Sequence, residues 1–178
     1  AMLARLRRGE TYRIRGDFDV AGRDFRAAAQ LDPTATRPLE ALGDVLYEQE
    51  RFKRAAETYQ ERLRLDDRSA LIRYKLALAR YRDGAPREAL DEARLARGLD
   101  DQLADAYYLE ALCLRDLGQL DAAVAALRSA VERGPGMVAA REELADLFAV
   151  TGHYADQLEQ LQVIAGLDSR QPQRQIAL

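Results

Sequence analysis

The side chains that most often carry catalysis are few in this chain and do not occur in working combinations. The single histidine, His153, has no second base or metal-ligand candidate beside it in the sequence, so we interpret it as a solvated turn residue. The single cysteine, Cys113, falls at a place in the pattern described below that is otherwise filled by apolar or small residues. That placement favours a buried small hydrophobe over a nucleophile. The three serines, Ser69, Ser129 and Ser169, have no partner histidine. The sequence therefore predicts that the chain is not an enzyme, and it predicts neither a metal site nor a cofactor.

Adjacent carboxylates are the remaining candidates for acid–base chemistry. They occur as Asp66-Asp67 and Asp100-Asp101, one repeat length apart and at the ends of helical segments. At such junctions an aspartate caps or faces the N-terminus of the next helix. We therefore assign these pairs a structural role.

The composition is that of a folded protein with a well-solvated surface. Of its 178 residues 48% are hydrophobic and 32% charged, and the net charge is −3. A slightly acidic chain without a basic stripe argues against nucleic acid as the partner. No apolar run approaches the about 20 residues that cross a bilayer, which argues against membrane insertion. The N-terminal residues are too polar for a signal peptide, and the compartment stays unassigned, either cytoplasmic or periplasmic.

Small residues recur every 34 positions through almost the whole chain. One such series is Gly9, Gly43, Ala77, Ala111 and Ala145, and a second is Ala21, Ala55, Ala89 and Ala123. A period of this length predicts a helical solenoid. We place five repeats at residues 2–35, 36–69, 70–103, 104–137 and 138–171, forming one array over 2–171, with 172–178 as a tail or the start of a further helix.

Each repeat is predicted to hold two helices joined by a tight turn. The first helix of repeat 2 is expected from Arg37 to Gln49, because its apolar residues follow the helical period. At position 15 of the repeat, glycine is expected to take a positive φ just past the helix, and only Glu50 departs from glycine there. The glycines at this position are Gly16, Gly84, Gly118 and Gly152.

These spacings resemble those of the tetratricopeptide repeat, whose pattern combines Leu-Gly, Tyr, Ala, Phe, Ala and Pro at set positions. The matching residues are Gly9, Tyr12, Ala21, Phe25, Ala28 and Pro33 in repeat 1; Leu39, Leu42, Gly43, Ala55 and Tyr59 in repeat 2; Tyr107, Ala111, Ala123, Ala130 and Pro135 in repeat 4; and Leu144, Ala145, Phe148, Gly152 and Tyr154 in repeat 5. The resemblance implies an all-α fold, an α-solenoid in which antiparallel helix pairs form a right-handed superhelix. It also implies a protein-binding scaffold.

Four arginines depart from this pattern. Arg5, Arg73 and Arg141 take a slot near the start of the first helix that is usually large and apolar. Arg62 takes a slot that is usually small, so its head group must reach solvent or find a carboxylate. In repeat 5, Gln157 and Ile164 replace both small residues of the second helix, which predicts looser packing there.

In the family, the first helix of each repeat lines a concave groove. Carrying its positions over gives a tyrosine-rich centre bordered by charge, and we predict that this centre binds the partner. Its residues are Glu40, Asp44, Tyr47, Tyr74, Leu78, Tyr81, Arg82, Tyr108, Leu112 and Arg115. The alternative is that the tyrosines only pack against neighbouring helices.

Two classes of partner are disfavoured by the same residues. Family members that clamp C-terminal carboxylates use lysine and asparagine in the groove, whereas this chain has no asparagine and carries Leu6 and Glu10 at such places. RNA-binding helical repeats keep a different period, and Glu40 and Asp44 would repel phosphate. The leading hypothesis is a non-catalytic scaffold that binds an extended peptide or a partner helix.

Two alternatives stay open. The repeats could self-assemble through open ends, because residues 2–35 hold seven Arg against five Asp and Glu, whereas residues 138–171 hold two Arg against six. The chain could instead be a regulatory or targeting segment of a larger enzyme or envelope-assembly protein. Arginine and alanine enrichment suggests a bacterial source, and the placement of both ends at repeat boundaries suggests a piece of a longer array.

Overall fold

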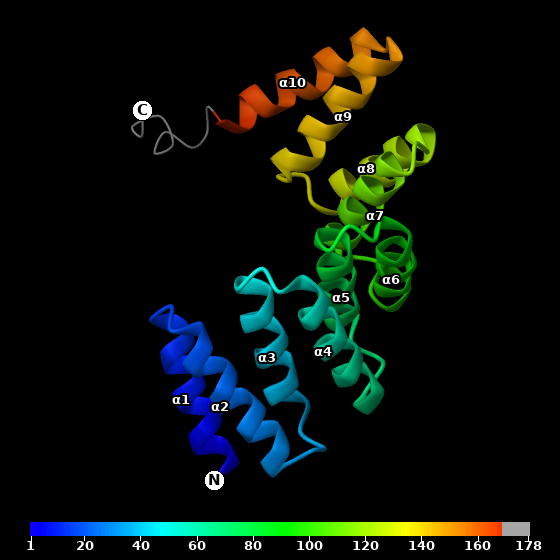
Figure 1. Cartoon of the computed structure of the whole chain (residues 1–178). Coiled ribbons are helices and arrows are strands. Elements are labelled where there is room, and N and C mark those ends of the chain that lie inside the picture. Colours follow the sequence, from blue (N-terminus) through cyan, green and yellow to red (C-terminus); the bar gives the residue numbers. More distant parts are fainter. Residues whose placement is uncertain (169–178) are drawn as a thin grey trace. The chain divides into compact units, whose positions relative to one another are not determined.

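The computed structural model describes residues 1–168, and that part of the chain consists of helices joined by short turns (Figure 1). The helices are α1 (Met2–Ile14), α2 (Phe18–Leu31), α3 (Thr36–Glu48), α4 (Phe52–Leu65), α5 (Ala70–Arg82), α6 (Pro86–Leu99), α7 (Ala104–Asp116), α8 (Leu120–Arg133), α9 (Val138–Thr151) and α10 (Tyr154–Asp168). The predicted all-α class is thus confirmed. The predicted tail at 172–178 lies outside the described residues.

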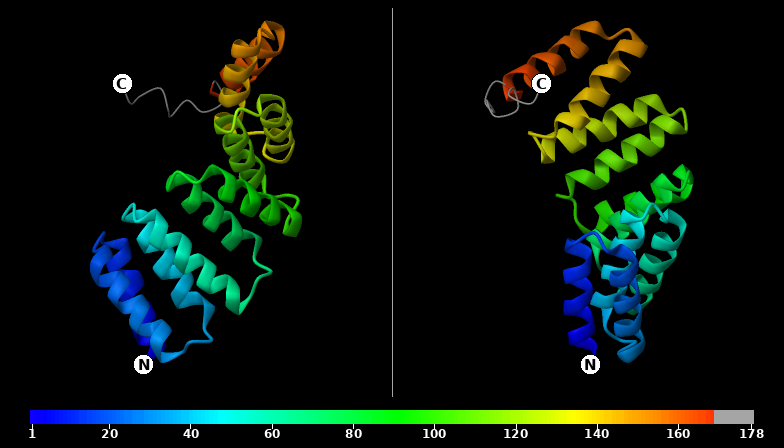
Figure 2. Two further views of the ribbon diagram at one scale, coloured as in Figure 1. Left: turned by 45° about the vertical axis from the view of Figure 1, so that its right-hand side comes forward. Right: turned by 60° about the vertical axis from the view of Figure 1, so that its left-hand side comes forward.

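The helices divide into two compact units, which are described separately below. The first, Ala1–Asp100, holds α1 to α6, and the second begins at Asp101 and holds α7 to α10. Within each unit consecutive helices pack on one another, and each odd-numbered helix forms an antiparallel hairpin with the next (Figure 2). The odd-numbered helices begin 34 residues apart, at Met2, Thr36, Ala70, Ala104 and Val138. The single array boundary of 2–171 stays a prediction.

The turn between the helices of each pair uses the left-handed backbone region in all five repeats. Gly16, Gly84, Gly118 and Gly152 have φ between 75° and 83°, as predicted. Glu50 occupies the same place with φ 58°, so the backbone keeps this geometry even without glycine. This turn also explains why α3 ends at Glu48, one residue before the predicted end, because Gln49 is already its C-cap residue. Its start, Thr36, is also one residue earlier than predicted.

The recurring small residue of the first helix packs directly against position 24 of the second. A Cβ at Gly9 would lie 2.5 Å from the Phe25 ring, and one at Gly43 would lie 2.5 Å from the Tyr59 ring. The other three repeats place Ala93, Leu127 and Leu161 at position 24, and they carry alanine in place of the glycine. Glycine therefore occurs in the two repeats where a ring fills the space between the helices.

The arginines at the apolar slot are explained by a partner 19 residues further along the chain. Arg5 Nη1 donates to Asp24 Oδ1 at 2.9 Å, and Arg73 Nη1 donates to Glu92 Oε2 at 3.1 Å. Arg141 repeats the contact with the side-chain oxygen of Gln160 at 3.0 Å. Repeats 2 and 4 have no arginine at this slot and no carboxylate or amide 19 residues further on, where Thr58 follows Leu39 and Ala126 follows Tyr107. The arginine contact thus occurs in every second repeat.

Two further expectations concern single polar side chains. Arg62 is buried and finds the carboxylate that it needs, because its Nη1 donates to the Asp66 backbone oxygen at 2.6 Å and to Asp66 Oδ2 at 3.2 Å. Asp66 Oδ1 accepts the Arg68 N–H at 3.2 Å, whereas the cap of the next helix is Ser69. The Asp66-Asp67 pair therefore does not cap that helix, and the alternative, that it faces the helix N-terminus, stays a prediction. Cys113 is fully buried, as predicted, and burial raises the pKa of its thiol to about 12.

Asp24 should make the first helix pair sensitive to acid. Its carboxylate is 1% exposed and accepts two hydrogen bonds of 2.6 Å from Arg8 besides the one from Arg5. These bonds, that from Arg8 foremost, lower its pKa to about 2. A depressed pKa stabilises the fold above the unfolded-state value of about 3.9 and loses this effect as the pH falls toward 2. We predict that Asp24→Asn lowers the free energy of unfolding by about 2 kcal/mol at pH 7 and that the difference shrinks below pH 4. Urea unfolding between pH 7 and 3 measures it, and a difference that does not change with pH would contradict the assignment.

The contact between Gly9 and Phe25 predicts a coupled pair of substitutions. Gly9→Ala should destabilise the fold by about 1–3 kcal/mol, because the new methyl meets the ring. Phe25→Leu alone should cost on the order of 1 kcal/mol. The double variant recreates the pairing of Ala111 with Leu127 in repeat 4, so its loss should be smaller than the sum of the two. Thermal and urea unfolding of the four proteins form the cycle, and strict additivity would show that the two positions do not interact.

Candidate functional site

The first unit contains a pocket of about 260 Å³ whose walls come mainly from α3 and α5. Its lining combines aromatic and apolar residues with an equal number of charged ones: Arg13, Asp44, Tyr47, Glu48, Tyr59, Tyr74, Lys75 and Leu78. We call it the first-unit pocket. Tyr59 comes from α4 and Arg13 from α1, so four helices of the unit contribute to it.

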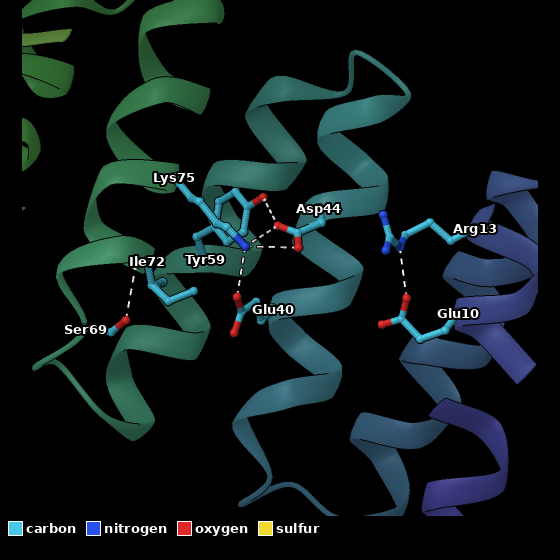
Figure 3. Close-up of polar contacts among 8 residues, drawn as sticks. All are labelled: Glu10, Arg13, Glu40, Asp44, Tyr59, Ser69, Ile72 and Lys75. Carbon is cyan, nitrogen blue, oxygen red and sulfur yellow. Dashed lines mark hydrogen bonds and ion pairs between the residues drawn. The ribbon is translucent and has the colours of Figure 1, made fainter. Parts of the chain in front are cut away.

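A network of charged hydrogen bonds links α3 to α5 at this pocket (Figure 3). Lys75 Nζ donates to Glu40 Oε1 at 2.9 Å and to Asp44 Oδ2 at 3.0 Å. Asp44 Oδ1 also accepts the Tyr59 hydroxyl at 2.7 Å, so one carboxylate connects three helices. Because each group is bonded to a partner on another helix, the network ties α3, α4 and α5 together beside the pocket.

The pKa shifts follow from this geometry. Burial lowers the pKa of Lys75, but its hydrogen bonds to Glu40 and Asp44 outweigh burial and raise the pKa above its usual value. Burial and then the charge of Asp44 raise the pKa of the Tyr59 hydroxyl. Lys75 thus stays charged and Tyr59 stays neutral near pH 7, and neither group is suited to act as a base there.

The sides of the pocket are held by weaker contacts. Arg13 Nε donates to Glu10 Oε2 at 3.0 Å, and this ion pair lies beside the network in Figure 3. The Tyr47 ring packs edge-on against Phe52 with centroids 5.2 Å apart, and the Arg82 guanidinium lies 5.1 Å from the Phe52 centroid. Tyr47 is half-buried, and burial raises its pKa.

The second unit has its own pocket of about 340 Å³, between α7 and α9 with one residue of α10. We call it the second-unit pocket; its lining is Tyr108, Ala139, Glu142, Glu143, Ala145, Asp146 and Leu161. Arg115 Nη1 donates to Glu143 Oε2 at 2.6 Å, and Arg115 Nη2 donates to Asp116 Oδ1 at 2.9 Å. Tyr108 is partly buried, and burial followed by the charge of Glu143 raises its pKa.

The structure gathers about half of the predicted groove residues at these two pockets. Asp44, Tyr47, Tyr74 and Leu78 line the first-unit pocket, and Tyr108 lines the second-unit pocket. The other five lie outside both linings. Glu40 adjoins the first through Lys75, Arg115 adjoins the second through Glu143, Tyr81 and Leu112 are partly buried, and Arg82 is exposed at the end of α5. That these residues bind a partner stays a prediction.

The prediction did not name ten of the fifteen lining residues, and five of these ten lie outside the groove positions of the first helix. Lys75 and Glu143 both occupy position 6 of the repeat, Ala145 occupies position 8, and Tyr59 and Leu161 occupy position 24 on the second helix. A signal for Lys75 existed, because it is one of only two lysines in the chain. Tyr59 could have been suspected from Gly43, which makes room for its ring.

The groups considered first for chemistry lie away from both pockets. His153 is exposed in the turn before α10, with Nδ1 at 2.8 Å from Thr151 Oγ1. Among residues 1–168, no three His, Cys, Asp or Glu side chains converge in a way that could hold a metal ion. None of the helices in this part of the chain is long and apolar enough to span a membrane.

Comparison with known structures shows the same fold. A crystal structure of MamA shares 24% identity, with 93% of this chain and 96% of that chain covered and a TM-score of 0.87. YrrB, described as a TPR protein with an unusual peptide-binding site, shares 20% identity over 96% of this chain and 88% of its own, with a TM-score of 0.76. PilF of Pseudomonas aeruginosa shares 20% identity over 93% of this chain and 75% of its own, with a TM-score of 0.81. At these identities the likeness establishes the fold alone.

Comparison with sequence families gives the assignment. A model described as tetratricopeptide repeat matches residues 108–172, and a model described as TPR repeat matches residues 43–84. Together the two segments cover more than half of the chain. No curated protein matches it. With the matched segments, the 34-residue spacing of the helix pairs and the shared fold in agreement, the chain belongs to the tetratricopeptide-repeat family.

Proposed function

We propose that this protein is a non-catalytic scaffold that binds a peptide segment of a partner protein, and that the first-unit pocket receives an apolar side chain of that segment. Tetratricopeptide repeats support interactions between proteins, and the finer assignment rests on this one pocket. Tyr47, Tyr74 and Leu78 offer a partly exposed apolar surface in a hollow of the size of a large side chain. Tyrosines in such hollows are among the residues that contribute most to binding.

The hydrogen bonds beside the pocket support the proposal. The Lys75, Asp44 and Tyr59 bonds tie α3, α4 and α5 together without filling the hollow. A preformed pocket loses little conformational entropy when a ligand enters, so more of the contact energy appears as affinity. Because Lys75 is neutralised by two carboxylates, the pocket floor does not attract an anionic side chain. An apolar or aromatic side chain fits this floor best.

The experiment is a selection of peptides followed by affinity measurements. A library of displayed peptides with nine randomised positions is selected on the full chain, and the enriched peptides are measured by fluorescence anisotropy. We predict that Tyr47→Ala with Tyr74→Ala weakens binding at least tenfold, because each truncation of a central interface tyrosine costs about 1–2 kcal/mol. Tyr154→Ala, which removes a 68% exposed tyrosine of α10, is the matched control and should leave affinity unchanged. Equal affinity for the double variant and the control would remove the first-unit pocket from the function.

A second candidate, self-association, is favoured by exposed apolar side chains of α10. Leu158 and Leu161 are 56% and 46% exposed, whereas Tyr59 and Leu127, which occupy the same repeat position as Leu161, are 2% and 1% exposed. With Tyr154 these residues form an apolar stripe at helical spacing. Stripes of this kind on a surface favour association.

Sedimentation velocity over a range of protein concentrations tests this candidate. The wild type should associate as concentration rises, with little change between low and high salt, because the face is apolar. Leu158→Glu should keep the protein monomeric, and Leu95→Glu, at a 50% exposed leucine of α6, should not. A wild type that stays monomeric at every concentration rules the candidate out.

A further inference from the structure

The second unit carries a large excess of negative charge. Residues 101–167 hold eleven Asp and Glu against four Arg and no Lys, whereas residues 1–100 hold 21 basic against 18 acidic residues. This excess lies in the unit that contains the second-unit pocket. The question is therefore which carboxylates of this unit lack a cation.

Three of the four arginines are held mainly by aromatic rings and neutral oxygens. Arg128 lies 5.6 Å from the Phe148 centroid. Arg133 lies 4.2 Å from the Tyr107 centroid and donates to the Ser129 backbone oxygen, and its contact with Glu132 is longer, at 3.8 Å. Arg141 donates to the Pro135 backbone oxygen and to Gln160. Of these four arginines, only Arg115 makes short contacts with carboxylates in the part of the chain that the structure describes. Its partners are Glu143 and Asp116.

Glu142 and Asp146 are the carboxylates at the pocket that this arrangement leaves without a cation. Both line the second-unit pocket, both are exposed, and they lie one turn apart on α9. Neither makes a hydrogen bond or ion pair with another residue in the part of the chain that the structure describes. Like charges at this spacing destabilise a helix slightly, so the fold itself gains nothing from the pair. A cation bound between them would be attracted by both.

The rest of the lining suits a long basic side chain. Ala139, Ala145 and Leu161 provide an apolar surface for a hydrocarbon stem, and Tyr108 adds an aromatic ring to the lining, a group that attracts cations. An apolar side chain would bury the stem surface but leave both carboxylates unpaired. An acidic side chain, or a phosphate, would be repelled by them.

We propose that the second-unit pocket binds an arginine or lysine side chain of a basic segment in the partner protein, with Glu142 and Asp146 as its counter-charges. This inference rests on the proposed scaffold function and adds the chemistry of the partner. It differs from the role of the first-unit pocket, whose cations Lys75 and Arg13 are already matched by Glu40, Asp44 and Glu10. The two pockets thus select different side chains.

The library selected on the full chain tests the proposal through the composition of the enriched peptides. Arginine and lysine should be enriched over the unselected library on the wild type, and the enrichment should disappear on Glu142→Gln with Asp146→Asn. The control is Asp121→Asn with Glu159→Gln, which removes the same charge from two exposed sites on α8 and α10. It should keep the enrichment.

Affinities of one enriched basic peptide give the size of the effect. The Glu142→Gln, Asp146→Asn variant should bind about tenfold more weakly, because two ion pairs with the peptide are lost, and its binding should depend less on salt. The proposal is overturned if basic residues are not enriched on the wild type, or if the variant and its control bind equally. If Tyr47→Ala with Tyr74→Ala abolishes binding and Glu142→Gln with Asp146→Asn does not, the proposed scaffold function is supported and this inference alone is rejected. Insensitivity to both pairs would remove both proposals.

Discussion

The close approach of the two helices in each repeat is the constraint on which the rest of the structure depends. It is set by the contact between position 8 of the first helix and position 24 of the second. Where position 24 is a ring, as in Phe25 and Tyr59, position 8 must be glycine, because a single added carbon would lie 2.5 Å from the ring. Where position 24 is smaller, alanine fits. The sum of the two volumes is therefore restricted, as expected for an interior packed at crystal density. Because position 8 is restricted by this packing, the recurrence of glycine or alanine there is explained without a ligand.

Hydrogen bonds and ion pairs then join the helices that the small residues allow to pack closely. Within a helix pair, Arg5 with Asp24 and Arg73 with Glu92 join the two helices at one place in the repeat. Between pairs, position 6 of the first helix provides the connection. Lys75 reaches Glu40 and Asp44 in the preceding repeat of the first unit, and Glu143 reaches Arg115 in the preceding repeat of the second unit. The sign of the charge is reversed, whereas the position is the same. Both connections lie beside a pocket, so the residues that hold the first helices together also fix the pocket walls.

This coupling between structure and pocket gives the two units different surfaces on one scaffold. In the first unit the cations of the pocket are neutralised by neighbouring carboxylates, and tyrosines provide most of what a ligand would touch. In the second unit three of the four arginines are held mainly by rings and neutral oxygens, and the exposed carboxylates Glu142 and Asp146 line the pocket. Repeat proteins diverge in this way because surface positions can change while the packing positions stay fixed.

The sequence by itself determined the fold, the length of each repeat and the places of the turns, because helical periodicity and the small residues are local signals that recur five times. It also indicated Asp44, Tyr47, Tyr74, Leu78 and Tyr108 as surface positions on the first helices, since their spacing places them on one stripe. Only the tertiary structure showed that Tyr59 of α4 lines a pocket formed mainly by α3 and α5, and that Lys75 of α5 donates a hydrogen bond to Asp44 of α3. It alone separated the carboxylates that have a cation from Glu142 and Asp146, which have none among the described residues. The physical reason is that ion pairing and pocket formation depend on distances between side chains from different repeats, and a period along the chain carries no information about which of two nearby charges an arginine will contact.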